Sequence, residues 1–217
     1  MNQEEYREKR HARQLPRLKV FMDVVFAILL WQIFMMLPDI KNYPEVKTVW
    51  ELLTIDLDDL ATFVIGLIFI VIYWGQNNRL FSHLVSTDNK HTAISVVQLF
   101  LLLTYFHFMS MGLRFNDDPS ALLMQSVSLA LVGFTSMWGW HYAANKKDLI
   151  DSDMPKNNIP YMKVTILPEP IAACISIPFA FVGPIAWEIS WLSYPIVAYL
   201  IKKYVNAQVA KAMDSTP

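Results

Sequence analysis

The sequence predicts an all-α integral membrane protein with six transmembrane helices and both termini in the cytoplasm. Three observations support this fold class. The 217 residues are 54% hydrophobic with a mean hydropathy of +0.32, which would leave a soluble domain with too apolar a surface. Six apolar stretches are long enough to cross a hydrocarbon core about 30 Å thick. The basic residues also gather on one side of the membrane if these stretches alternate in direction.

The six spans form a single membrane domain over residues 1–217. We expect the spans at about residues 18–37, 60–75, 92–113, 120–142, 164–182 and 184–202. The first apolar stretch runs into Pro38 without a small-residue cleavage site, so it is expected to remain as a helix.

The orientation follows from the distribution of lysine and arginine between the spans. All of the 18 basic residues except Lys41, Lys47 and Arg114 lie in segments that share one side. The positive-inside rule makes that side cytoplasmic. An odd number of spans would destroy this segregation, so the charges support six. The net charge of -1 conceals the asymmetry, and no nucleic-acid partner is expected.

The connections are short or polar. Pro44 is followed by residues 45–57, which are long enough for a short amphipathic helix on the outer surface, whereas residues 143–163 are interpreted as a cytoplasmic linker. The last two spans meet at Val182-Gly183-Pro184, a turn so short that they must form an antiparallel hairpin.

Three prolines in the fifth span, Pro168, Pro170 and Pro178, are expected to kink or irregularise that helix. A membrane tolerates such breaks where neighbouring helices or water satisfy the freed carbonyl groups.

No catalytic constellation is present in the sequence, which has no phosphate-binding glycine loop, no HExxH and no paired-cysteine metal spacing. The one cysteine, Cys174, lies inside a span and supports neither a disulfide framework nor a metal site. We therefore expect neither an enzyme nor a cofactor.

Asp23 stands out because it lies about two turns into the first span, where a charge must face protein or water. Arg17 precedes it by six residues, a rotation of roughly 240° along a helix. The two side chains should therefore bond neighbouring helices rather than each other. A structural clamp and a gating or proton-sensing role both remain open for Asp23.

The segment Arg17-Leu-Lys-Val-Phe21-Met22-Asp23, followed by Val-Val-Phe-Ala-Ile28, resembles the Arg-x-x-x-Phe-Ser-Asp signature of the transmembrane protein 175 family of endolysosomal and prokaryotic potassium channels. The stretch from Tyr73 to Phe81, which includes Trp74 and Asn77, is similar to that family's Trp-x-x-His-His-x-Leu-Phe element. Six spans with both ends inside also match one family repeat.

This resemblance implies a homotetrameric ion channel that conducts potassium or other monovalent cations through a pore lined by the first helix. Alignment from Asp23 places the hydrophobic constriction at Ile28, and Gln32 and Met35 continue the same helical face. An ordinary packing stripe is the alternative interpretation of that face. Arg17, Phe21, Asp23, Trp74 and Asn77 would form the supporting network. As a prokaryotic member, the protein would be a multi-pass protein of the bacterial inner membrane.

Several residues depart from the family pattern. Met22 replaces the motif serine, Val24 replaces the following glycine, and Trp31 stands where many members have a pore threonine. Trp31 is too large for most pore faces and is expected to pack between subunits. An apolar Ile28 ring gates by dewetting, while Gln32 offers both donors and acceptors to either cations or anions.

The alternatives are a proton-coupled transporter or a channel of different ion selectivity, both using Asp23, and a non-conducting scaffold. No inverted repeat of the kind common in transporters is apparent between the two halves.

Overall fold

The computed structural model describes residues 3–55, 57–115, 118–146, 148–155 and 158–214. These residues are helical apart from turns, loops and one isolated β-bridge. The elements in chain order are α1 (Gln3–Phe34), η1 (Ile40–Asn42), α2 (Val49–Thr54), α3 (Leu57–Ser82), α4 (Asn89–Arg114), α5 (Pro119–Asn145), α6 (Asn158–Ile166), α7 (Pro168–Phe179), α8 (Pro184–Ser190) and α9 (Ser193–Asp214).

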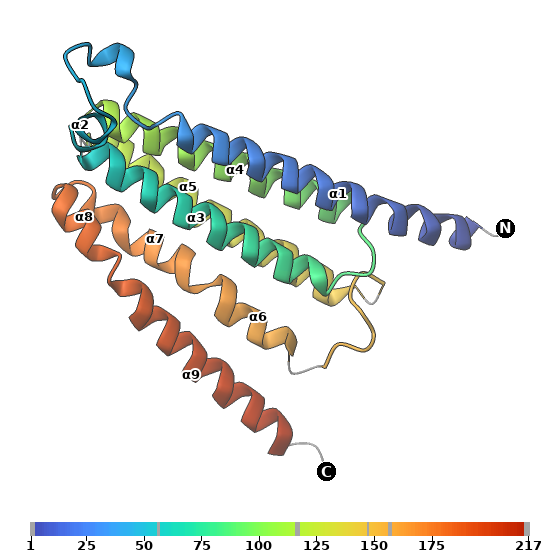
Figure 1. Ribbon diagram of the computed structural model, residues 1–217. Helices are drawn as coiled ribbons and strands as arrows, with labels where there is room; N and C mark the ends of the chain where they lie inside the picture. The colour runs from blue at the N-terminus through green and yellow to red at the C-terminus, as the bar shows by residue number, and fades with distance from the viewer. Residues whose placement is uncertain (1–2, 56, 116–117, 147, 156–157, 215–217) are drawn as a thin grey trace.

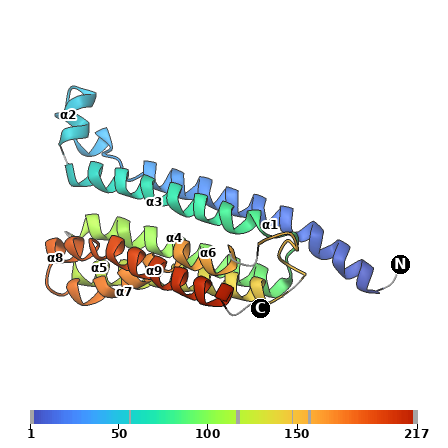
Figure 2. The same cartoon turned by 90° about the horizontal axis from the view of Figure 1, so that it is seen from below.

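The long helices lie side by side (Figure 1), with α1 and α3 on one side of the bundle and α4 to α9 on the other (Figure 2). Helix α1 packs along α3 and onto α4, α4 packs along α5, and α5 packs along α7. The core between them is apolar. Its fully buried side chains include Leu29, Tyr73, Phe106, Leu129 and Ile166.

Four helical stretches of the described chain are long and apolar enough to cross a membrane. They are Phe63–Ser82, Asn89–Gly112, Pro119–Asn145 and Ile159–Phe179. The predicted all-helical fold with several spans is confirmed. The number of six spans and the sides of the termini stay predictions, because α1 carries Arg17, Lys19 and Asp23 in its apolar part and α9 contains Lys202 and Lys203.

The fifth expected span is two helices, α6 and α7, which meet at Leu167 directly before Pro168. The irregularity predicted from the prolines is confirmed. The sixth expected span is also divided, between α8 and α9, and the turn between them precedes Pro195. A proline lacks the N–H that a continuous helix would need at these places.

The helices of the last two expected spans form a hairpin, since α7 packs against both α8 and α9 and α6 packs against α9. Gly183 turns the chain with a φ of 140°, a conformation that glycine adopts at little cost. The expected short helix after Pro44 is α2, which a capping box of Thr48 and Glu51 begins.

The segment 143–163, interpreted as a linker, is anchored to the rest of the bundle in its described part. Leu149 and Ile150 are buried, and Ile150 pairs with Leu84 in an antiparallel bridge. Helix α6 already begins at Asn158. The segment still connects α5 to α6, and its two adjacent apolar residues hold it against the α3–α4 connection.

Candidate functional site

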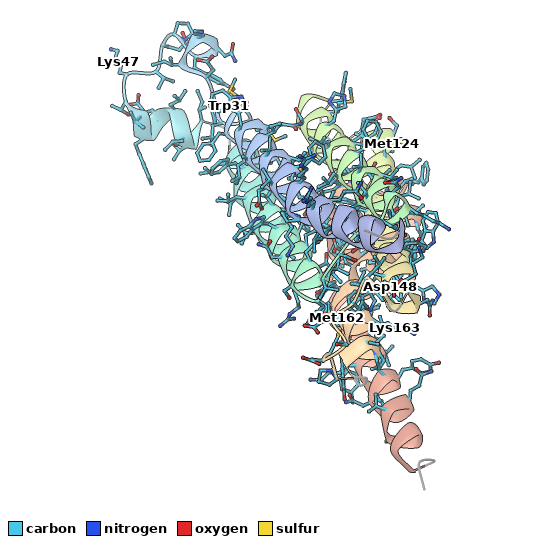
Figure 3. The ribbon with its side chains drawn as sticks, turned by 90° about the vertical axis from the view of Figure 1, so that its right-hand side faces the viewer. Trp31, Lys47, Met124, Asp148, Met162 and Lys163 are labelled. Carbon is cyan, nitrogen blue, oxygen red and sulfur yellow. The ribbon has the colours of Figure 1, made fainter. Side chains whose placement is uncertain are left out.

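The outer face of α1 is an apolar stripe that no other described part of the chain covers. It consists of Val20, Val24, Ile28, Trp31 and Met35, which recur every three or four residues and are between 52% and 67% exposed. Trp31 lies near the end of α1 that adjoins α2 (Figure 3). Spacing of this kind places side chains on one side of a helix.

Two of the three predicted pore residues, Ile28 and Met35, belong to this outer face. Met35 lies in the turn that follows the last residue of α1, Phe34, although its N–H still donates to the carbonyl of Trp31 at 3.1 Å. Gln32 is half-buried at the edge of the stripe. The three therefore remain on neighbouring positions of one surface.

The opposite face of α1 holds the helix against the bundle. Met22, Val25, Leu29 and Ile33 are buried there. Ile33 lies over Gly66 of α3, where a Cβ atom would come within 2.4 Å of Ile33 Cδ1. The absence of a side chain at Gly66 lets the two helices approach closely, so the orientation of the outer face is determined by packing on the inner one.

Asp23 finds its partner on α3. Trp74 Nε1 donates a hydrogen bond to Asp23 Oδ1 at 3.1 Å. The bond joins the two segments from which the family resemblance was predicted. A small cleft beside it is lined by Lys19, Met22, Asp23 and Phe26 from α1 and by Trp74, Asn77, Asn78 and Phe81 from α3. The expectation that Asp23 bonds a neighbouring helix is met.

The other predicted network residues are placed differently. Arg17 and Phe21 are exposed, and the Arg17 side chain makes no hydrogen bond or ion pair with a side chain that the structure describes. Asn77 is buried and lies on the same cleft as Asp23, but its bonds lead elsewhere. Its Nδ2 donates to the carbonyl of Tyr73 at 3.0 Å, and its Oδ1 accepts from Gln98 Nε2 of α4 at 3.4 Å.

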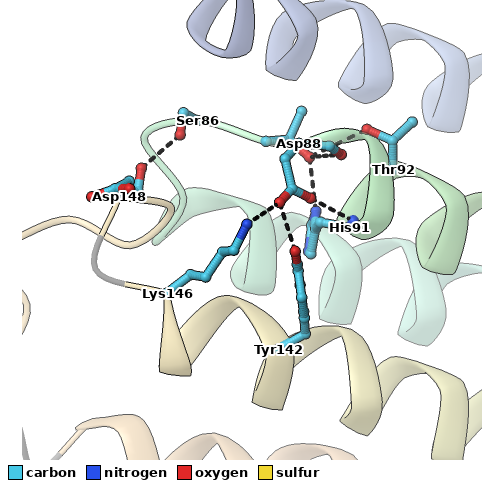
Figure 4. A network of polar contacts seen from close by, with 8 residues as sticks. Ser86, Asp88, His91, Thr92, Tyr142, Lys146 and Asp148 are labelled. Carbon is cyan, nitrogen blue, oxygen red and sulfur yellow. Dashed lines mark hydrogen bonds and ion pairs between the residues drawn. The ribbon is translucent and has the colours of Figure 1, made fainter. Parts of the chain in front are cut away.

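A cluster around Asp88 was not predicted from the sequence (Figure 4). Asp88 caps α4, because its Oδ1 accepts from the N–H of His91 at 2.8 Å. Its Oδ2 accepts from Tyr142 Oη and Lys146 Nζ, both at 2.6 Å. Beside it, Ser86 Oγ donates to the Asp148 carbonyl at 2.6 Å. We call Asp88, Tyr142 and Lys146 the α4–α5 clasp.

The hydrogen bonds of the clasp control the charge of Asp88. Burial by itself would raise the pKa of this carboxyl, but the bonds from His91, Lys146 and Tyr142 outweigh it and lower the pKa to about 2. The hydrogen bond to Asp88 in turn raises the pKa of Lys146. Both residues are therefore charged at neutral pH.

A second residue that sequence reasoning missed is Glu169 of α7, which is 8% exposed and accepts a hydrogen bond from Tyr73 Oη. The sequence contains a signal for this residue, because Glu169, like Asp23, is an acid inside an apolar stretch. Within the described residues no group of three or more histidine, cysteine or acidic side chains is arranged to hold a metal ion.

The helices and their polar contacts define a multi-pass, all-helical membrane protein in which buried polar bonds join the spans. Residues 17–105 match the model of a family described as the endosomal/lysosomal potassium channel TMEM175. The match begins at the first residue of the Arg17–Asp23 motif and runs through α2 and α3 into α4.

The predicted resemblance is thereby confirmed for this part of the chain. The matched family is one of potassium channels and not a class of enzymes, which supports an ion channel over an enzyme. Comparison of the chain with curated proteins and with solved structures found no match.

Proposed function

We propose that this protein is a homotetrameric ion channel that conducts potassium or other monovalent cations through a pore lined by α1. The match of residues 17–105 to a potassium channel family supports the transport function. One chain contributes one copy of α1, so a pore lined by this helix requires several copies around an axis.

The observation that carries the proposal is the outer face of α1. Ile28 is 52% exposed there, while Leu29, the next residue, is fully buried. A ring of four Ile28 side chains would form a hydrophobic constriction that gates by dewetting. Gln32 and Met35 would form the next rings along the axis.

The role of the polar network follows from its contacts. The hydrogen bond from Trp74 to Asp23 supports a structural role, since it joins the exposed side of α1 to α3 beside the outer face. In a proton-coupled transporter, Asp23 would instead have to exchange this bond during each cycle. The two functions therefore differ in whether Asp23 is needed for transport itself.

The test is ion flux through purified protein in liposomes. Ile28→Asn should raise the flux on the order of tenfold, equivalent to a barrier lower by ~1.4 kcal/mol, because an amide ring keeps the constriction wet. The matched control is Ile68→Asn on α3, an isoleucine with the same exposed fraction of 52%. This variant should leave the flux unchanged.

Reversal potentials under potassium, sodium, chloride and proton gradients then identify the conducted ion. Absence of flux under every gradient would contradict the channel. An equal rise in both variants would show that the outer face of α1 does not line the pathway. A flux that saturates with substrate, requires a proton gradient and is lost in Asp23→Asn would favour the transporter.

A further inference from the structure

The break between α6 and α7 lies in the middle of a membrane span. Leu167 separates the two helices, and Glu169 stands at the midpoint of the apolar stretch Ile159–Phe179. Pro168 and Pro170 have no N–H to donate to the carbonyl groups one turn earlier. No side chain caps the start of α7. Figure 1 shows α3 running beside this junction.

Two side chains of α3, three residues apart, reach the break. Tyr73 Oη donates a hydrogen bond to Glu169 Oε1. Gln76 Nε2 donates to the carbonyl of Thr165 at 3.1 Å. Tyr73 is fully buried, Gln76 is 9% exposed and Glu169 is 8% exposed. Two polar groups on either side of the break are thus bonded by side chains of a neighbouring helix. In transport proteins, breaks of this kind within a span are places where ions and substrates bind.

Glu169 has no cationic partner among the described residues. The titratable groups that interact with it are three phenols, Tyr73 of α3, Tyr105 of α4 and Tyr194 of α9. The described parts of α5, α6 and α8 place no charged side chain against it. An ionised carboxylate without a counter-ion is costly in a membrane span, so a residue in this position marks a functional site.

The same cluster has an unused hydrogen-bond acceptor. Gln76 Oε1 is buried and accepts no hydrogen bond from the residues that the structure describes. A protonated carboxyl has one O–H to donate, whereas an ionised one has none. The free acceptor of Gln76 and the O–H of a protonated Glu169 are complementary, and a cluster with every polar group paired is the stable arrangement of buried polar groups.

We propose that Glu169, Tyr73 and Gln76 form a proton-binding site inside the membrane, in which Glu169 carries the proton in the arrangement described. The site stands apart from the outer face of α1 and from the ion that the protein conducts. Release of the proton leaves a charge that only water or a cation can compensate.

The test is infrared spectroscopy of the full chain in lipid nanodiscs at stepped pH. A protonated carboxyl has its own C=O stretching band, which disappears when the group ionises. We expect this band at neutral pH in the wild type and its loss in Glu169→Gln. Tyr73→Phe should shift the band without removing it, because the carboxyl loses one hydrogen bond. Glu188→Gln, which changes an exposed glutamate of α8, should leave the band unchanged.

Absence of the band in the wild type at neutral pH would overturn the proposal, since Glu169 would then be ionised in the folded protein. Persistence of the same band in Glu169→Gln would overturn it as well, because another acid would carry the proton. The wild-type spectrum and the Tyr73→Phe shift decide the question even where Glu169→Gln does not fold. A protein that binds this proton but conducts no ions would contradict the channel and leave the site intact.

Discussion

Asp88 is the residue whose surroundings most clearly determine its charge. Three hydrogen bonds from His91, Tyr142 and Lys146 keep it ionised at the N-terminal end of α4. Because its partners come from α4 and α5, the charge of one side chain contributes to the contact between two helices. Its stabilising effect must therefore depend on pH.

We expect Asp88→Asn to flatten the dependence of stability on pH between about 4 and 2. The pKa of Asp88 is lowered from 3.8 to about 2 in the folded protein. The stabilisation is therefore complete above pH ~4 and is lost as the pH falls toward 2, an effect of about 1 kcal/mol after allowance for solvent screening. Thermal unfolding of the wild type and the variant across this range measures it.

Asp148→Asn is the control for this prediction. Asp148 is an exposed neighbour of the clasp, and only its backbone carbonyl takes part in the contact with Ser86. The control should keep the pH dependence of the wild type. Identical curves for all three proteins would show that the clasp contributes nothing to stability.

The sequence predicted that Asp23 needs a partner on another helix, and the structure supplies Trp74. The sequence did not indicate the role of Asp88. An acid that precedes a helix gives the same sequence pattern whether or not it also bonds residues 54 and 58 positions later. Glu169 lies between two prolines, and the pattern of this segment indicates a break in the backbone without indicating that Tyr73 bonds the carboxyl group. Local pattern identifies a side chain that requires a contact, but the contact itself is a property of the packed bundle.

Among the elements, the helices α3, α4 and α5 were easier to predict than α6 to α9. Apolar length predicts where a helix can lie, and α3, α4 and α5 agree with the expected spans near residues 60–75, 92–113 and 120–142, extending beyond each of them. Prolines locate breaks but not their extent. The divided fifth and sixth spans depend on how α7 packs against α5 and α9, which periodicity along one helix does not describe.

Helices α5 and α7 approach most closely where Gly133 faces Pro170. A Cβ atom at Gly133 would lie 2.6 to 2.7 Å from three ring atoms of Pro170, and a proline ring cannot move aside. Gly133→Ala should therefore destabilise the protein by about 1–3 kcal/mol through overpacking. A lower midpoint of thermal unfolding in detergent would show it.

Gly75→Ala of α3 is the matched control, because a Cβ atom there meets nothing within 4 Å. Alanine is the better helix former, so this variant should be unchanged or up to about 1 kcal/mol more stable in the single chain. Equal destabilisation by both substitutions would show that the close contact between α5 and α7 is not the cause.

At the scale of the whole molecule, α1 and α9 lie on opposite sides of the bundle in both ribbon views (Figures 1 and 2). Both carry large exposed apolar side chains, such as Ile28 and Leu200. Lipid and a second copy of the chain are equally apolar environments, so composition does not distinguish a lipid-facing surface from a subunit interface. The sequence indicated the face of α1 that holds Ile28, but not what covers it.

Cysteine cross-linking distinguishes the two surfaces. With Cys174→Ser as background, Ile28→Cys should form disulfide-linked species under mild oxidation in the membrane, because a shared axis brings copies of this face together. Leu200→Cys on α9, at a similar exposed fraction of 56%, should remain a single chain on a denaturing gel. Cross-linking of Leu200→Cys without cross-linking of Ile28→Cys would show that the subunits meet at α9 and not at α1.

The α4–α5 clasp also has a consequence for the order in which the protein matures on the ribosome. Asp88 is synthesised long before Tyr142 and Lys146, and at ~5–20 residues per second the delay is on the order of several seconds. During that time α4 emerges with a capping carboxylate that has only its own helix to bond. Residues 17–105, which carry the family match, therefore complete their packing only after translation has passed Lys146 and then Glu169, which accepts a hydrogen bond from Tyr73.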